Sequence, residues 1–173
     1  EDPRCPRNAF YFARELTFYH LWDEAIAALN TYLDMPEATW PNERCYAMRL
    51  LGKAYDHKQN PWEALKWYRM AIAEAPGTRE PWVDAAMSFY MKSMWKECFH
   101  AATMALEIKD KQLVYTCDPE VWGAKPHDLA AVAAHHLGLK DEAIRHGVAA
   151  VDLSPDDERL VRNLRYCGLS DAA

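Results

Sequence analysis

Histidines are the side chains of this chain best suited to bind a metal, and four of them lie close together in sequence: His127, His135, His136 and His146. Two ligands on one helix face need a spacing of three or four residues. The adjacent pair His135 and His136 point about 100° apart on a helix, and eight residues separate His127 from His135. No carboxylate completes a set, so we interpret these residues as polar helix-surface histidines and predict no metal site and no cofactor.

Three pairs of carboxylates lie at the starts of predicted helices: Asp23-Glu24, Asp141-Glu142 and Asp156-Asp157. At a helix start, an acidic side chain caps free N–H groups and complements the helix dipole. General acid–base chemistry would need burial or a neighbouring nucleophile, and no hydrolase, P-loop or dinucleotide-binding motif is present. We therefore predict that the chain is not an enzyme. A free Cys-His pair and an enzyme in its own right remain as alternatives, which sugar transfer by the isolated chain would support.

The cysteines do not form a recognisable framework. They number five, the spacings are wide, and no CxxC motif joins any of Cys5, Cys45, Cys98, Cys117 and Cys167. An odd number at irregular spacing disfavours both disulfides and structural zinc. Reduced thiols are typical of intracellular proteins, so we expect a cytoplasmic protein.

Composition narrows the classes of partner. The net charge of −6 disfavours a general nucleic-acid binder, which usually carries a basic stripe. No run of about 20 apolar residues predicts a membrane span, and no signal peptide is evident. The chain opens at Glu1 without a Met, so we expect a processed product or a piece of a longer protein.

The clearest pattern in the sequence is an internal repeat. The segment 51–55 reads Leu-Gly-Lys-Ala-Tyr, and it is followed by Ala64, Tyr68, Ala71 and Pro76. This order of large, Gly, Tyr, small, aromatic, small and Pro resembles the tetratricopeptide repeat (TPR) closely. Small residues in both helices of such a repeat allow close approach, and Pro ends the second helix.

The repeat predicts the whole architecture. Units are expected at 6–39, 45–78, 79–112 and 124–157, with inserts at 40–44 and 113–123 and a polar capping helix at about 156–168. The first helices are expected at about 7–20, 43–57, 79–92 and 126–137, and the second at about 23–34, 62–74, 95–108 and 140–152. We therefore expect one all-α domain over 1–173, a right-handed TPR-type α-solenoid of about four helix pairs.

In TPR arrays the first helix of each pair lines a concave groove. The positions that line it select these candidate binding residues: Phe10, Arg14, Phe18, Arg49, Lys53, His57, Met87, Tyr90 and Asp128. Cations beside aromatics could hold an acidic peptide, a C-terminal carboxylate or a phosphate-bearing ligand. The alternative is that the cations are solvated or pair with acidic residues of the same chain. The pattern does not match the carboxylate-clamp TPRs, which use Lys and Asn at set positions.

Two tryptophans lie in or beside the inserts. Trp40 and Trp122 could contact sugar rings or a partner, or they could close the edges of the solenoid over its longer connections.

A second resemblance is narrower. The stretch YTCDPEVWGAKPHD, residues 115–128, and the following DLAAVAAHHLG, residues 128–138, are similar to a segment of TPR modules attached to family-2 glycosyltransferases. The opening residues 8–36 are similar to the start of such modules. This resemblance implies an accessory part, because the catalytic domain of those enzymes is absent from these residues.

The leading hypothesis is a non-catalytic protein-interaction or substrate-docking module, accessory to a glycosyltransferase. Its partner would be a protein or peptide, such as a glycosyltransferase domain or its acceptor. One alternative is a structural solenoid that self-associates through its N-terminal end, where Phe10, Tyr11 and Phe12 have no obvious cap. Another is that the chain is part of a glycosyltransferase whose catalytic domain lies elsewhere.

Overall fold

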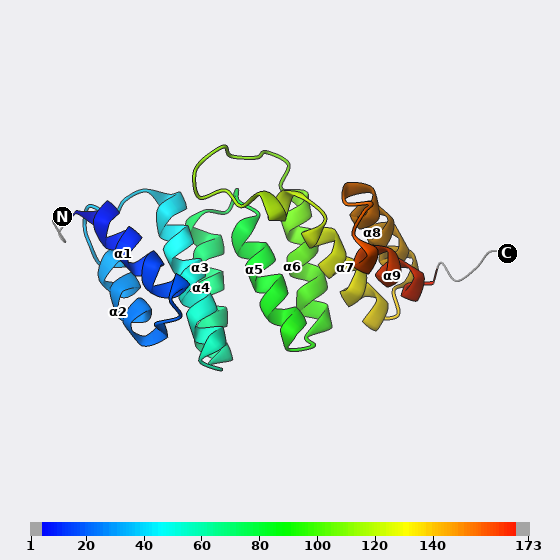
Figure 1. Cartoon of the computed structure of the whole chain (residues 1–173), viewed down its shortest axis with the longest axis horizontal. Helices are drawn as coiled ribbons and strands as arrows, with labels where there is room; N and C mark the ends of the chain where they lie inside the picture. Colours follow the sequence, from blue (N-terminus) through cyan, green and yellow to red (C-terminus); the bar gives the residue numbers. More distant parts are fainter. Residues whose placement is uncertain (1–4, 169–173) are drawn as a thin grey trace. The chain divides into compact units, whose positions relative to one another are not determined.

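The computed structural model describes residues 5–168, and its contacts group into two compact units. Unit 1 ends at Pro76 and unit 2 begins at Gly77. Within the described residues the regular structure is helical throughout, without a strand (Figure 1). The predicted all-α fold class is therefore confirmed. The repeat boundaries and the single-domain assignment stay predictions.

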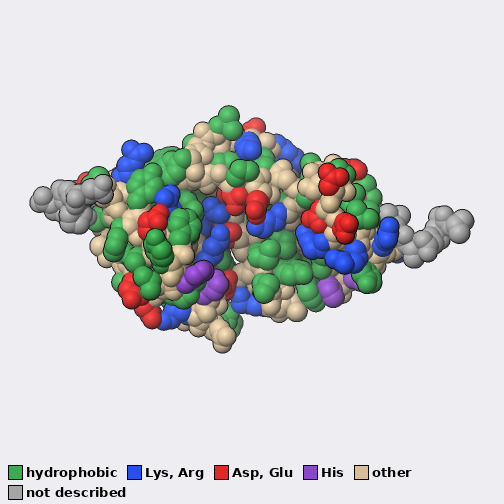
Figure 2. Space-filling model, viewed as in Figure 1, with side chains coloured by type: hydrophobic (Ala, Val, Ile, Leu, Met, Phe, Trp, Pro, Cys, Tyr) green, Lys and Arg blue, Asp and Glu red, His purple; other side chains and the backbone are tan. Residues whose placement is uncertain are grey.

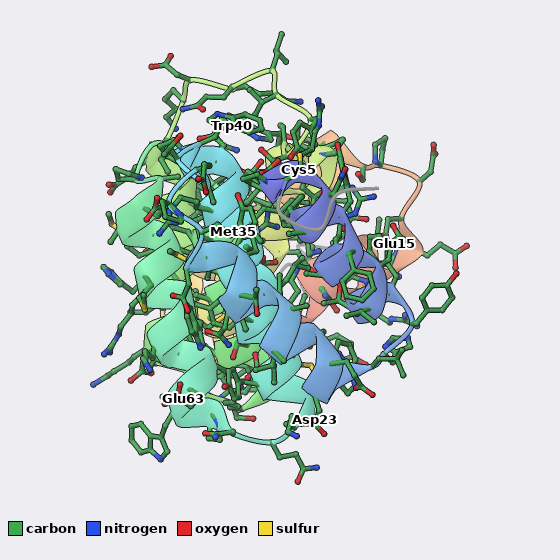
Figure 3. All side chains as sticks on the ribbon, turned by 90° about the vertical axis from the view of Figure 1, so that its left-hand side faces the viewer. Cys5, Glu15, Asp23, Met35, Trp40 and Glu63 are labelled. Carbon is green, nitrogen blue, oxygen red and sulfur yellow. The ribbon has the colours of Figure 1, made fainter. Side chains whose placement is uncertain are left out.

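Unit 1 consists of two helix pairs. Its helices are α1 (Pro6–Phe18), α2 (Trp22–Leu33), α3 (Pro41–His57) and α4 (Pro61–Glu74). Cys5 and Trp40, which precede α1 and α3, lie at one edge of unit 1, whereas Asp23 and Glu63, in the first turns of α2 and α4, lie at the opposite edge (Figure 3). The chain therefore runs up and down, with α1 and α3 parallel to each other.

Unit 2 repeats the arrangement and adds a terminal helix. Its helices are α5 (Glu80–Met91), α6 (Trp95–Glu107), the short 3₁₀ helix η1 (Pro119–Trp122), α7 (Lys125–His136), α8 (Lys140–Leu153) and α9 (Glu158–Tyr166). Helix α9 packs against α8 and α7, and Asp157 caps its N-terminus by accepting from the N–H groups of Arg159 and Leu160. The ends of the α-helices agree with the sequence expectation to within about two residues, the scatter usual for helix termini.

The turn inside each helix pair has the same backbone conformation. One residue adopts a positive φ, at 58° in His20, 56° in Gln59, 56° in Ser93 and 74° in Gly138. The N–H of the next residue bonds to a carbonyl five residues earlier, at 2.9–3.0 Å. This is the Schellman end of a helix. Gln59 and Ser93 lie 34 residues apart, and the other two steps are longer by five and 11 residues.

Small residues set the distance between paired helices. A Cβ added to Gly52 of α3 would lie 2.5 Å from Cε1 of Tyr68 in α4, so the ring lies directly on the glycine. In unit 2 the buried positions of α7 are mainly alanines, including Ala130, Ala133 and Ala134. These contacts confirm the expectation that small side chains permit close helix approach.

Both longer connections are held by an arginine that donates to carbonyl groups. Arg44 of α3 donates to the carbonyls of Leu33 and Ala38 at 3.0 and 3.1 Å. Arg79, before α5, donates from Nε to the carbonyl of Ile108 at 2.9 Å and from Nη1 to that of Val121 at 3.4 Å. The second connection contains η1, which the sequence analysis did not anticipate. Asp118 caps it and Pro119 starts it, which is an ordinary helix-start signal.

Within residues 5–168, none of the helices combines the length and the apolar character that crossing a bilayer requires.

The positive φ values at Gly138 and Ser93 predict different effects on stability when each residue is replaced. We expect Gly138→Ala to destabilise unit 2 by about 1 kcal/mol, because a Cβ disfavours the left-handed conformation and no atom lies within 4 Å of the added carbon to offset that cost. We expect Ser93→Gly to leave stability unchanged or raise it by a few tenths of a kcal/mol, roughly the balance of relieved strain and glycine entropy. Urea denaturation of both variants checks this, and an unchanged midpoint for Gly138→Ala would contradict it.

Candidate protein-interaction surface

Helix α1 carries a stripe of aromatic and basic side chains. Tyr11, Arg14 and Phe18 are three and four residues apart, the spacing that places side chains on one helix face. The guanidinium carbon of Arg14 lies 4.7 Å from the ring centroid of Tyr11 and 5.5 Å from that of Phe18. Both distances lie within the range of a cation–π contact. The two rings therefore hold the cation in place on the helix surface.

The positive charge of Arg14 is only weakly balanced by neighbouring carboxylates. Its side chain is 25% exposed, and its carboxylate contact is Glu15 at 3.2 Å, whose side chain is half exposed. An exposed pair between sequence neighbours contributes little. The Nε atom of Arg14 is buried and has no hydrogen-bond partner among the described residues. Arg14 thus presents a partly desolvated cation whose donors are not all used.

Helix α3 repeats the pattern beside α1. Tyr46, Arg49 and Lys53 are again three and four residues apart, and the guanidinium carbon of Arg49 lies 5.2 Å from the ring centroid of Tyr46. The ring of Phe10 packs 5.6 Å from that of Tyr46 and so joins α1 to α3. We call the six residues Tyr11, Arg14, Phe18, Tyr46, Arg49 and Lys53 the basic–aromatic face of unit 1.

The acidic side chains of α3 make contacts with other helices of unit 1. Glu43 is buried and accepts a 2.8 Å hydrogen bond from the Tyr32 hydroxyl of α2. Asp56 accepts from the Tyr68 hydroxyl of α4 at 3.0 Å. Burial, together with the bond to Glu43, raises the pKa of Tyr32, so the phenol stays protonated and keeps donating. Figure 2 shows basic and hydrophobic side chains next to one another over α1 and α3.

Two of the predicted binding residues lie deeper than expected. Phe10 is fully buried among Tyr11, Tyr32 and Tyr46, so it has no surface for a ligand, and we remove it from the candidate contacts. Arg49 is only 3% exposed. It orients Tyr46 and adds positive charge beneath the face, but it offers a ligand little direct contact.

The other predicted residues of unit 1 lie at its edges. His57 is exposed and stacks on Trp22, with ring centroids 4.3 Å apart and planes 10° from parallel. Trp40 is the N-cap residue of α3 and is 39% exposed. Phe18 is 57% exposed. From the predicted set, the structure therefore brings together Arg14 and Phe18 on α1 and places Lys53 on α3, four residues after Arg49. It adds Tyr11 and Tyr46, which were identifiable by their three-residue spacing from Arg14 and Arg49.

In unit 2 the predicted residues take part mainly in internal contacts. Asp128 accepts from Nη1 of Arg159 at 2.6 Å and from Nδ2 of Asn163 at 3.0 Å, both from α9. Trp122 is half buried, with the guanidinium carbon of Arg79 3.9 Å from its ring centroid. Met87 and Tyr90 are half buried in α5. Trp122 thus packs against Arg79, which donates to the carbonyls of Ile108 and Val121 in the same connection.

The histidines of unit 2 require a correction. His135 and His136 are exposed, as expected, but His146 is only 2% exposed and lies against His127. The prediction that all four are surface histidines is therefore wrong for His146. Helical spacing within one segment does not reveal a contact between α7 and α8, so the sequence offered no direct signal for this pair.

Comparison with known proteins supports a TPR-like fold but does not identify a family. No family model matches the sequence, and no curated protein matches it. Among solved structures, the chain is similar to MamA (TM-score 0.72, 16% identity, covering 94% of this chain and 80% of that one). It is also similar to a putative kinesin light chain with TPR-like repeats from Podospora anserina (TM-score 0.67, 16% identity, covering 96% and 87%).

A third similar structure contains a bound peptide. It is the second TPR domain of human RPAP3 in complex with the HSP70 peptide SGPTIEEVD (TM-score 0.62, 17% identity, covering 74% of this chain and 98% of that one). Identities this low show the fold alone. The chain therefore has a TPR-like helical-repeat fold, and the predicted association with family-2 glycosyltransferases finds no support in these comparisons.

The contacts of Asp128 predict that it holds the terminal helix. We expect Asp128→Asn to destabilise α9 locally by about 1 kcal/mol, because two charge-assisted hydrogen bonds weaken at a partly exposed site. Faster amide hydrogen exchange over 158–166 with unchanged exchange in unit 1 would confirm this. Unchanged exchange in α9 would contradict it, and Asp152→Asn, an exposed carboxylate in α8, is the control.

Proposed function

We propose that the chain is a protein-interaction module, and that the basic–aromatic face of unit 1 binds an acidic segment of a partner protein. The observation that carries this proposal is the placement of Arg14 and Arg49 on the rings of Tyr11, Phe18 and Tyr46 in a protein whose net charge is −6. Basic side chains gathered on one face of an acidic protein repel positively charged partners and favour partners that present carboxylates.

The geometry favours carboxylates for a second reason. An arginine held by ring contacts loses less side-chain entropy when it binds than a free arginine does. Its planar guanidinium matches a carboxylate in two parallel hydrogen bonds. Lys53 adds a further charge from α3, four residues after Arg49. Exposed Phe18 offers apolar area next to these charges, so a segment that combines acidic and apolar residues fits the face.

The comparisons agree with such a ligand. The RPAP3 TPR domain is bound to a peptide that contains two glutamates and a terminal aspartate. TPR-like neighbours of this kind support an interaction role over a catalytic one. The accessory role in sugar transfer, and membership of a larger glycosyltransferase, rest on the sequence resemblance alone and stay predictions.

Peptide binding tests the proposal directly. The probe is an array of nonapeptides that carry Glu and Asp, each matched to a copy with Gln and Asn, scored by fluorescence polarisation at two salt concentrations. We expect acidic peptides to bind more tightly than their neutral copies and to weaken with salt. Arg14→Gln and Lys53→Gln should each reduce affinity by roughly fivefold to tenfold, about 1 kcal/mol per charge.

The matched control is Arg69→Gln, because Arg69 is an exposed cation on α4 of the same unit and lies outside the face. It should leave affinity unchanged. Equal binding of acidic and neutral peptides, or equal loss from Arg69→Gln, would contradict the proposal.

Self-association remains a second candidate because α1 and its C-cap residue also expose large side chains that are not among the six residues of the face. Phe12 is 62% exposed and Tyr19 73% exposed. Under this alternative, light scattering gives a mass that rises with concentration, and Phe12→Ser lowers that mass without changing affinity for the acidic peptides.

A further inference from the structure

A pair of histidines joins α7 to α8 in unit 2. The Nδ1 atoms of His127 and His146 lie 2.9 Å apart, and the ring centroids lie 5.2 Å apart. His146 is 2% exposed and His127 is half buried. A contact this short between two ring nitrogens requires one proton between them, so one ring donates and the other accepts.

Arg145 fixes which ring donates. Its Nη2 atom lies 3.0 Å from Nε2 of His146, and a guanidinium has only donors. Nε2 of His146 therefore accepts, which places the proton of this neutral ring on Nδ1. His146 then donates to Nδ1 of His127, and His127 carries its own proton on Nε2.

An additional proton has no place in this arrangement. The two nitrogens without a proton are Nε2 of His146 and Nδ1 of His127, and each already accepts a hydrogen bond. Protonating either nitrogen breaks one of these bonds and leaves two N–H groups facing each other. The loss is expensive because His146 is buried and water cannot replace the bond.

The charges around the pair oppose protonation further. Arg145 of α8, Arg79 before α5 and Lys109 after α6 act on the pair, and Phe99 of α6 packs edge-on against His146. The nearest carboxylate, Glu142, lies 3.7 Å from Nε2 of His146, but it is already bonded to Arg145. Burial first, and then Arg145, lowers the pKa of His146 to about 4, and burial and Arg79 lower that of His127.

A metal ion suits this site poorly. Two imidazole nitrogens at this separation could in principle share a cation, but the three neighbouring basic side chains repel one. Among residues 5–168 no third His, Cys, Asp or Glu completes a metal-binding group. The same cations that disfavour a metal also disfavour an additional proton on either ring.

We propose that the His127–His146 pair is an acid-sensitive latch between α7 and α8. It is closed while both rings are neutral and His146 donates to His127, and it opens when either ring takes up an additional proton. The unfolded pKa of histidine is about 6.5, and both folded values lie below it. The unfolded chain therefore binds more protons, so stability is fully present above about pH 6.5 and falls as the pH drops toward 4.

Opening would extend to the terminal helix. Helix α9 packs on α8 and α7, and Asp128 of α7, next to His127 in sequence, holds Arg159 and Asn163 of α9. Acidification is thus expected to lower the local stability of residues 125–166 together.

Nuclear magnetic resonance of the imidazole nitrogens in the unaltered chain tests the latch. At pH 7 we expect His146 as the Nδ1–H tautomer and His127 as the Nε2–H tautomer, with His146 still neutral at pH 5. The Nε2–H tautomer for His146, or a titration midpoint near that of a free histidine, would overturn the proposal whatever any variant does.

Hydrogen exchange tests the consequence. After correction for intrinsic rates, we expect amides of α7, α8 and α9 to exchange on the order of tenfold faster at pH 5 than at pH 7.5. The double variant His127→Gln/His146→Gln should lose this pH dependence, and His100→Gln, an exposed histidine of α6, should keep it. Equal pH dependence in the double variant, or none in the unaltered chain, would overturn the latch.

Discussion

Close approach of paired helices is the constraint on which the rest of this structure depends. In unit 1 the ring of Tyr68 lies where a side chain on Gly52 would be, and in unit 2 alanines line the buried side of α7. Because one helix pair cannot bury its apolar face alone, each pair must also lie close to the next. Small residues supply that proximity, and large ones such as Phe10, Tyr32 and Leu51 fill the space that remains.

This packing determines which side chains are left for function. Phe10 joins α1 to α3 in the core, and the same contact sets Tyr46 beneath Arg49 and beside α1. Arg14 and Arg49 are thereby held on aromatic rings rather than extended into water. In unit 2 the same close packing brings the Nδ1 atoms of His127 and His146 to 2.9 Å from each other. The basic–aromatic face of unit 1 and the His127–His146 contact of unit 2 thus follow from one packing rule, applied to different residues.

Helical periodicity predicted most of the fold but not the depth of its residues. The repeat pattern that runs from Leu51 through Tyr68 to Pro76 located the helix ends, since the effect of proline on a helix is local. The same register selected Phe10 and Arg49 as groove residues, yet both are buried. Position within a repeat defines a direction around the helix axis, whereas burial depends on neighbours from other helices. For that reason, the sequence could not predict the His127–His146 contact or the hydrogen bonds from Arg79 to the carbonyls of Ile108 and Val121.

A double-mutant cycle at the closest helix contact tests the packing rule most directly. Gly52→Ala forces Tyr68 to move and should destabilise the chain by about 1–3 kcal/mol, measured by urea denaturation. Tyr68→Leu should leave room for the added carbon. We expect the double variant to be more stable than the sum of the single effects by at least about 1 kcal/mol. Additive effects, or a stable Gly52→Ala variant, would contradict it.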